Sequence, residues 1–176
     1  MKLIILDRDG VINEDSDEFI KSPDEWFAIP GSLEAISLLK QNGWHVAVAT
    51  NQSGISRGYF DSQTLQRIHA KMQSALSAYG TKIDIIVHCP HGPSDSCDCR
   101  KPKPGLYRQI ANHFKCSLFN VPVIGDSERD LVAALEVKAS PILVKTGKGL
   151  KTLANLGSTN KYLTYDNLYS AVLSLI

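Results

Sequence analysis

Four short polar clusters carry side chains that can bind a cation or an anion. "DRDG" (7–10) and "GDSERD" (125–130) supply carboxylates, "TNQSG" (50–54) supplies hydroxyl groups and amides, and "RKPKPG" (100–105) supplies positive charges. Carboxylates brought close together repel one another unless a divalent cation or a cationic side chain lies between them. The four clusters together therefore predict a charged site that binds a metal ion, an anion or both.

A fifth cluster has the composition of a zinc site. Three thiols and one imidazole follow a C-x-H-x5-C-x-C pattern, formed by Cys89, His91, Cys97 and Cys99. Four protein ligands close a tetrahedral zinc site, so we expect structural Zn²⁺ that fixes the neighbouring Arg100 and Lys101. A set of free buried thiols is the alternative. His88 also competes as a ligand, although a continuing strand directs it to the opposite side.

Composition limits the classes of protein. The chain has 176 residues, 43% of them hydrophobic, which is enough for one globular domain, and we expect a single domain over residues 1–176 with the zinc loop at 89–99. The formal charge of +1 gives no electrostatic reason to expect nucleic acid or a membrane as partner. No run approaches the roughly 18 apolar residues of a membrane helix, and we expect a cytoplasmic monomer.

Short apolar runs alternate with amphipathic segments along the chain. The apolar runs predict strands at 2–6, 45–50, 82–89, 121–125 and 141–146. The amphipathic segments predict helices at 32–43, 61–80, 105–114, 127–137 and 167–176. This alternation is typical of an α/β fold with a parallel sheet between two layers of helices.

The polar clusters follow the predicted strands. In an open parallel sheet, ligands bind outside the carboxyl ends of the strands. "DRDG", "TNQSG", the zinc cluster with "RKPKPG", and "GDSERD" each come directly after a strand. We therefore expect all of them at one edge of the sheet.

Each cluster also has an ordinary structural interpretation. Asp7 and Asp9 are common turn formers, and Thr50 can simply end a strand. Asp126 and Asp130 can cap the positive end of a helix. Their coincidence at four strand ends favours a functional site over four independent turns and caps.

The order of these residues resembles a known family. "DRDGV" (7–11), "TN" (50–51), Lys101 and "GDSERD" (125–130) resemble the four motifs of the haloacid dehalogenase (HAD) superfamily of phosphohydrolases. The resemblance extends from residue 3 to about residue 146. It implies a Rossmann-like parallel sheet between helices and a phosphatase activity.

The resemblance also implies the roles of four residues. Asp7 is the nucleophile, which attacks phosphorus and forms an aspartyl-phosphate. Asp9 is the general acid and base, protonating the leaving oxygen and then activating water. Thr50 and Lys101 stabilise the phosphoryl group.

A catalytic Mg²⁺ follows from the same resemblance. Its expected ligands are the carboxylates of Asp7 and Asp126 and the backbone carbonyl of Asp9. Asp130 is expected to orient these groups and not to bind the metal directly.

The zinc cluster narrows the resemblance to a subgroup. Cysteine and histidine directly before "CRKPKPG" resemble the histidinol-phosphatase-like subgroup, whose members have no large cap domain. "TNQSGISRGYF" (50–60) and "VKTGKG" (144–149) favour removal of the C7 phosphate of D-glycero-D-manno-heptose 1,7-bisphosphate, a step towards nucleotide-activated heptose and lipopolysaccharide. The short spacer between His91 and Cys97 favours the alternative, histidinol phosphate in histidine biosynthesis.

The substrate contacts are expected in three places. Arg100 suits a phosphate or several hydroxyls, with a salt bridge within its loop as the alternative. Further contacts are expected from Asn51, Gln52 and Ser53, and from a loop that departs from the usual family residues, Asp15, Ser16, Asp17 and Glu18. The basic stretch 145–151 has no assigned role.

Two classes without catalysis remain. A zinc-bearing module that only binds phosphosugars would retain the polar clusters but lose a carboxylate at position 7 or 9, and both are present. A zinc-bearing interaction domain would need neither "DRDG" nor "GDSERD". The sequence therefore favours the enzyme.

Overall fold

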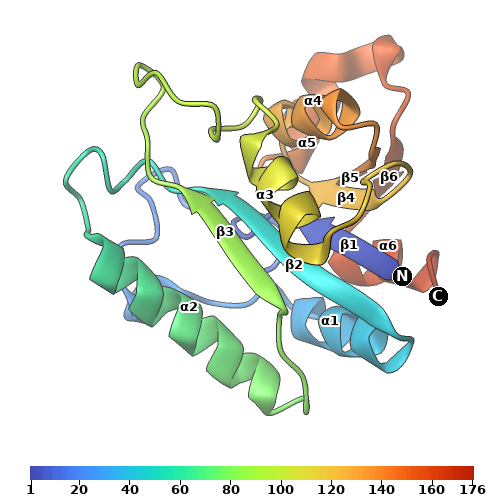
Figure 1. Ribbon diagram of the computed structural model, residues 1–176, viewed down its shortest axis with the longest axis horizontal. Coiled ribbons are helices and arrows are strands. Elements are labelled where there is room, and N and C mark those ends of the chain that lie inside the picture. Colours follow the sequence, from blue (N-terminus) through green and yellow to red (C-terminus); the bar gives the residue numbers. More distant parts are fainter.

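The computed structural model describes residues 1–176, and its centre is a six-stranded parallel sheet (Figure 1). The strand order is β3-β2-β1-β4-β5-β6, and every neighbouring pair is parallel. The strands are β1 (Lys2–Leu6), β2 (Trp44–Asn51), β3 (Ile85–Cys89), β4 (Pro122–Gly125), β5 (Ser140–Val144) and β6 (Leu163–Tyr165). The predicted α/β fold class is confirmed.

Six α-helices connect or follow the strands. They are α1 (Ser32–Gln41), α2 (Ser62–Ser77), α3 (Gly105–Phe114), α4 (Glu128–Glu136), α5 (Gly149–Leu156) and α6 (Leu168–Leu173), with short 3₁₀ turns at Pro23–Glu25 and Gly157–Thr159. Local capping explains where some begin. The Asp61 carboxylate accepts a hydrogen bond from the Thr64 amide at the start of α2, and Ser127 forms a capping box with Asp130 at the start of α4.

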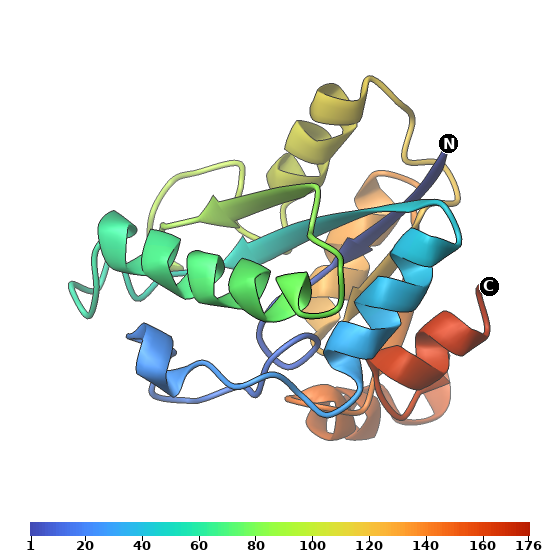
Figure 2. The same cartoon turned by 90° about the horizontal axis from the view of Figure 1, so that it is seen from below.

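The helices cover both faces of the sheet (Figure 2). Alternate side chains of a strand point to opposite faces. Ile4 and Leu6 pack with α1, α2 and α6, whereas Leu3 and Ile5 pack with α3 and α4. Two hydrophobic cores therefore hold the central strands rigidly, and their carboxyl ends form a firm base for a site.

The predicted elements are all present, with shifted ends. Helix α2 stops at Ser77 and not at residue 80, because Gly80 adopts a positive φ of 67° that ends the helical geometry. Strand β3 begins at Ile85 and not at residue 82. Helix α5 and strand β6 were not predicted: β6 has only three residues, and α5 lacks a side-chain cap at Lys148.

The connection between β1 and α1 runs from residue 7 to residue 31 and contains one 3₁₀ turn. It therefore carries no cap domain. None of the helices combines the length and apolarity needed to cross a membrane.

The sheet has its topological switch point between β1 and β4. From β1 the chain proceeds to β2 and β3 on one side, and the later strands lie on the other. The crevice outside such a point is where open α/β sheets bind ligands.

Candidate active site

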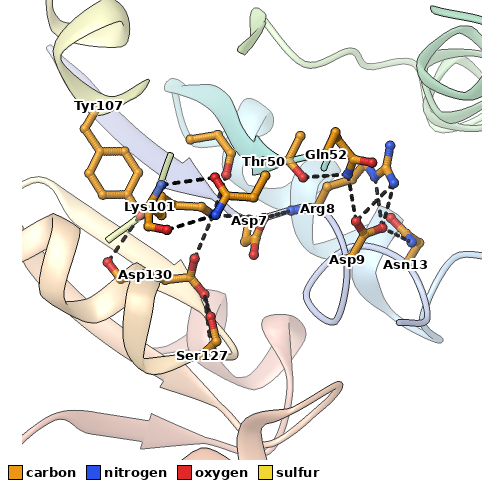
Figure 3. A network of polar contacts seen from close by, with 12 residues as sticks. Asp7, Arg8, Asp9, Asn13, Thr50, Gln52, Lys101, Tyr107, Ser127 and Asp130 are labelled. Carbon is orange, nitrogen blue, oxygen red and sulfur yellow. Dashed lines mark hydrogen bonds and ion pairs between the residues drawn. The ribbon is translucent and has the colours of Figure 1, made fainter. Parts of the chain in front are cut away.

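A buried lysine lies between two carboxylates at the switch point (Figure 3). Lys101 is 2% exposed, and its Nζ lies 3.1 Å from Oδ1 of Asp7 and 2.6 Å from Oδ1 of Asp130. Asp7 follows β1 and Asp130 lies in the first turn of α4. The same Nζ donates a 2.7 Å hydrogen bond to the Ala49 carbonyl of β2. Three elements therefore meet at one ammonium group.

The protonation states of Lys101 and Asp7 depend on each other and on Asp130. Burial alone lowers the pKa of Lys101, but Asp130 and Asp7 outweigh it and raise that pKa above its usual value. Burial raises the pKa of Asp7 to about 6, although Lys101 opposes the shift. The lysine therefore remains charged at neutral pH, and Asp7 is mainly ionised.

A third carboxylate completes a potential cation site. Oxygen atoms of Asp7, Asp126 and Asp130 lie within 4.8 Å of one another. Burial, together with the charges of Asp130 and Asp7, raises the pKa of Asp126 to about 8. Such crowding is relieved by a bound cation, and carboxylate oxygens are suitable ligands for Mg²⁺.

Asp130 has little capacity left for a metal. Its Oδ1 is paired with Lys101, and its Oδ2 accepts hydrogen bonds from the Ser127 amide (3.1 Å) and hydroxyl (2.6 Å). Asp126 has one oxygen engaged, since its Oδ2 accepts a 2.8 Å hydrogen bond from the Lys148 amide. The free oxygens that can hold a cation therefore belong mainly to Asp7 and Asp126.

Asp9, two residues beyond Asp7, is joined to it through Arg8, whose backbone amide donates a 2.7 Å hydrogen bond to Oδ1 of Asp7 (Figure 3). Its oxygens accept hydrogen bonds from Arg8 (2.8 and 3.0 Å from Nη2), Asn13 (2.9 Å) and Gln52 (2.8 Å). Burial alone raises the pKa of Asp9, but the Arg8 charge and these donors outweigh it and lower that pKa. The carboxylate is ionised in this arrangement.

Sequence reasoning missed Arg8 altogether. Its side chain is fully buried, and Nη1 also lies 3.3 Å from Nε2 of His69 in α2. Burial, with the nearby Arg8 and His88, lowers the pKa of His69 to about 3, so its ring is neutral and can accept a hydrogen bond from Arg8. Nothing in "DRDG" distinguishes this arginine from a solvent-exposed one.

Thr50 is the penultimate residue of β2 and is 1% exposed. Its hydroxyl oxygen accepts a 2.9 Å hydrogen bond from the Gln52 amide, which also donates to Asp9. Gln52 therefore links the Thr50 hydroxyl group to the Asp9 carboxylate.

These groups border a cavity of about 190 Å³. Asp7, Asp9 and Thr50 contribute to its walls, and four cations face the same space: Arg57, Arg100, Arg129 and Lys148. Such a combination can place an anion in contact with a carboxylate nucleophile.

Arg57, Arg129 and Lys148 were not identified from the sequence. Arg129 is notable because its Nε is buried without a hydrogen-bond partner. Burial alone lowers the pKa of Arg129, but Asp130, Asp7 and Asp126 outweigh it and raise that pKa. The sequence did contain a signal for Arg129: it lies in the first helical turn after "GDS", and that turn begins at the carboxyl end of β4, where ligands bind.

The expected substrate residues divide into two groups. Those that line the cavity are Asp15, Ser16, Asp17, Gln52, Ser53 and Arg100. Glu18 lines adjoining surface cavities instead. Asn51 is also absent from the lining: its Nδ2 donates to the Lys101 carbonyl (3.0 Å), and its Oδ1 accepts from the Lys101 amide (3.1 Å). Asn51 thus fixes the backbone of the buried lysine.

Most separations in the cysteine cluster are close to those of a tetrahedral zinc site, whereas the two sulfur atoms of Cys89 and Cys99 lie closer together. Tetrahedral zinc with the usual bond lengths separates two sulfur atoms by about 3.8 Å and a sulfur from a nitrogen by about 3.6 Å. The Sγ of Cys89 lies 3.8 Å from that of Cys97 and 3.1 Å from that of Cys99, and Nδ1 of His91 lies 3.5 and 3.4 Å from Cys89 and Cys99. All four cysteines of the chain are free thiols, so the cluster is not a disulfide.

The chain matches two family models. One, described as HAD-hydrolase-like, matches residues 98–171, and the other, polynucleotide kinase 3 phosphatase, matches residues 2–127. Together they include all the residues of the cavity.

Several relatives are similar over nearly their whole length. The D-glycero-β-D-manno-heptose-1,7-bisphosphate 7-phosphatase of Bordetella bronchiseptica is 59% identical over 157 residues, covering 89% of this chain and 88% of the relative. The enzyme of the same name from Pseudomonas putida is 53% identical over 176 residues, covering both chains completely.

Solved structures agree with this relationship. The crystal structure of the D,D-heptose 1,7-bisphosphate phosphatase from B. bronchiseptica, complexed with magnesium and phosphate, has a TM-score of 0.96 and 54% identity, covering 99% of this chain and 98% of that one. The corresponding enzyme from Burkholderia thailandensis has a TM-score of 0.78 and 44% identity, covering 99% and 98%. With this identity and coverage, the chain belongs to the HAD-like hydrolases, in the family of the D-glycero-D-manno-heptose-1,7-bisphosphate 7-phosphatases.

Proposed function

We propose that this protein removes the C7 phosphate of D-glycero-D-manno-heptose 1,7-bisphosphate. The observation that carries the proposal is one small cavity that contains both a carboxylate nucleophile, Asp7, and several cations beyond those needed for a single phosphate. A substrate with two phosphate groups explains both features. The names of the relatives point to the same reaction.

In the first half-reaction, Asp7 attacks phosphorus and the bond to the C7 oxygen breaks. The phosphoryl group becomes an aspartyl-phosphate, and Asp9 gives a proton to the leaving oxygen. Both oxygens of Asp9 accept hydrogen bonds in the structure. One of these oxygens must therefore lose a hydrogen bond before it can carry the proton that Asp9 gives to the leaving oxygen. In the second half-reaction Asp9 takes a proton from water, which attacks phosphorus and releases phosphate from Asp7.

Lys101 and Thr50 bind the phosphoryl oxygens. Lys101 remains paired with Asp130, so its ammonium can shift from Asp7 to the phosphoryl group without leaving its position. The Thr50 hydroxyl accepts from Gln52, which leaves its own proton free for a phosphoryl oxygen.

Mg²⁺ fits the carboxylates of Asp7 and Asp126 and, by the family resemblance, the backbone carbonyl of Asp9. When bound, it neutralises charge on the phosphoryl oxygens. Asp130 keeps its role of orienting Lys101.

The second phosphate is bound by guanidinium groups. Burial lowers the pKa of Arg100, and the nearby charges of Arg129 and Arg57 lower it further. Three mutually repelling guanidinium groups at one cavity are stabilised by a bound dianion. Gln52, Ser53 and the loop at 15–18 then supply hydrogen bonds to the sugar hydroxyls.

Zn²⁺ at the four-ligand cluster is structural. The Arg100 guanidinium donates a 3.0 Å hydrogen bond from Nη1 to the carbonyl of His91, one of the zinc ligands. The Lys103 ammonium likewise donates to the carbonyl of Cys97. A metal that fixes the loop therefore fixes Arg100 through its hydrogen bond to His91, and it fixes Lys101 through Cys99, two residues earlier in the chain.

Histidinol phosphate is the second candidate, because of the short spacer between His91 and Cys97. It carries a single phosphate and a positively charged amine, which three arginines repel. The heptose bisphosphate fits the charges of the cavity better.

The test is phosphate release from the two substrates, side by side, in excess Mg²⁺. We expect a kcat/KM for the heptose bisphosphate at least about 100-fold higher, since one charge-assisted pairing contributes about 3 kcal/mol. Asp7→Asn is the control and should abolish turnover of both. A preference for histidinol phosphate would overturn the assignment of heptose bisphosphate as the substrate. Full activity of Asp7→Asn would overturn the proposed mechanism.

The remaining expectations belong to the same proposal. The reaction supplies heptose 1-phosphate for nucleotide-activated heptose and lipopolysaccharide synthesis, and it takes place in the cytoplasm on a monomeric, single-domain enzyme.

A further inference from the structure

The TGKG loop, residues 146–149 between β5 and α5, lies directly against the Mg²⁺ ligand Asp126. Gly147 adopts a positive φ of 56°, and a Cβ atom at Gly147 or at Gly10 would collide with Oδ2 of Asp126. Glycine is needed at both positions because the backbone approaches the carboxylate so closely. The loop is therefore part of the wall that shapes the metal site.

Hydrogen bonds fix the TGKG loop to both neighbouring strand ends. The Thr146 hydroxyl donates a 2.6 Å hydrogen bond to the carbonyl of Gly10, after β1. The Lys148 amide donates to Asp126, after β4, over 2.8 Å. The backbone at Lys148 is thus held rigidly, which gives its side chain a defined starting point.

The Lys148 side chain extends to the other side of the cavity. Its Nζ lies 3.3 Å from Oδ2 of Asp15 and 3.8 Å from Oδ1 of Asp17. The Asp15 side chain is only 18% exposed, whereas that of Asp17 is 95% exposed, so the pair with Asp15 is the stronger of the two. All three side chains line the cavity.

The substrate loop, Asp15–Glu18, has few other polar contacts. The amides of Glu18 and Phe19 donate to Ser16, and Lys21 donates to the Glu18 carbonyl. These bonds all lie within residues 16–21. The two ion pairs with Lys148 are the only hydrogen bonds or ion pairs that join residues 15–18 to a more distant part of the chain.

We propose that Lys148 is a positioning residue, whose ammonium holds the substrate loop over the cavity and ties it to the strand that presents Asp126. The proposal rests on the function proposed above and adds a residue to it. Residues 15–18 contain no helix or strand, and their flanking residues are held by the amide of Glu14, which donates to the Phe27 carbonyl over 2.9 Å, and by Ile20, which is buried in the core. Between these two ends, Lys148 is the anchor that holds the loop. The TGKG loop supplies that anchor because its backbone is already fixed by the metal site.

Kinetics of four variants test this role. Lys148→Met keeps the chain length and the amide that donates to Asp126 but removes the charge. We expect it to raise KM for the heptose bisphosphate about fivefold, with kcat and the Mg²⁺ dependence unchanged. Asp15→Asn should have the same effect, and the double variant should lose no more than either single one. Lys148→Arg should restore most of the affinity.

Lys145→Met is the matched control. Lys145 lies in the same segment and pairs with Asp166 over 2.8 Å, but neither residue lines the cavity. We expect its KM to equal that of the wild type. Additive losses in the Lys148 and Asp15 double variant, or equal losses in the Lys145 control, would overturn the proposal.

Hydrogen exchange gives a second readout that does not require turnover. The amides of Glu18 and Phe19 should exchange faster in Lys148→Met and in Asp15→Asn, and at the wild-type rate in Lys145→Met. Unchanged exchange would overturn the anchoring role even if KM rises. If the wild type does not hydrolyse the heptose bisphosphate, the proposed function fails, and exchange alone then decides whether Lys148 holds the loop.

Discussion

Asn51 should act on catalysis through Lys101 and not through contact with the sugar. As part of "TNQSG" it was expected to contact the sugar, yet both polar atoms of its side chain bind the backbone of Lys101. Replacing it with alanine removes one donor and one acceptor from that backbone. We expect a loss of activity through Lys101, and hence the same loss on every phosphate ester.

The two hydrogen bonds set the size of the effect. Each contributes about 1 kcal/mol, so together they hold the lysine with about 2 kcal/mol. If that free energy is lost fully from the transition state, kcat/KM falls about 30-fold, because each 1.36 kcal/mol changes a rate tenfold. The free energy of unfolding should decrease by a similar amount, which chemical denaturation can measure.

The assay compares the heptose bisphosphate with a simple aryl phosphate. Asn51→Ala should lose activity on both in equal proportion, whereas a residue that binds the sugar would affect the bisphosphate alone. Asn51→Asp provides the control, because it retains the acceptor for the Lys101 amide and should recover part of the loss. An effect confined to the bisphosphate would refute the reasoning.

Three further predictions concern the zinc site, the arginines and a distant ion pair. Metal analysis should find one zinc per chain, and removing it should lower Tm and kcat together, with no recovery on adding Mg²⁺; a zinc-free, fully stable protein would contradict this. Arg100→Ala and Arg129→Met should each reduce kcat/KM for the bisphosphate at least about tenfold more than for an aryl phosphate, and equal losses would place both at the transferred phosphoryl group. Asp84→Asn should lower the free energy of unfolding at pH 7 by about 1 kcal/mol, since its carboxylate pairs with Lys40 at 2.7 Å. Burial alone raises the pKa of Asp84, but the hydrogen bonds from Lys40 and Val46 outweigh it and lower that pKa, so the difference should disappear as the pH falls below about 4.

The parallel sheet and its strand ends were predictable because their signals are local. Continuous apolar runs identify buried strands, and "DRDG" and "GDSERD" follow such runs directly. Helix α5 and strand β6 gave no comparable signal, since a three-residue strand such as β6 depends on its pairing with β5. That pairing is long-range information that a local pattern does not contain.

The position of Asn51 was predictable in principle. It lies at the end of β2, where successive side chains point to opposite faces, so Asn51 cannot face the same way as Thr50. The same alternation directs His88 and Cys89 of β3 to opposite faces. Arg8 differs, because its burial depends on α2, which reaches it from a distant part of the chain.

The two counter-charges of Lys101 are not equivalent during turnover. In the proposed mechanism Asp7 forms an acyl phosphate when it attacks phosphorus, so its carboxylate loses its negative charge while the phosphoryl group stays negative, and the ammonium must follow that charge. Asp130 takes no part in bond formation, and its second oxygen is fixed by Ser127. Asp130 therefore supplies a constant negative charge that keeps the buried Lys101 protonated in every state. This role explains why Asp130, which has little capacity for a metal, lies beside Asp7 and Asp126.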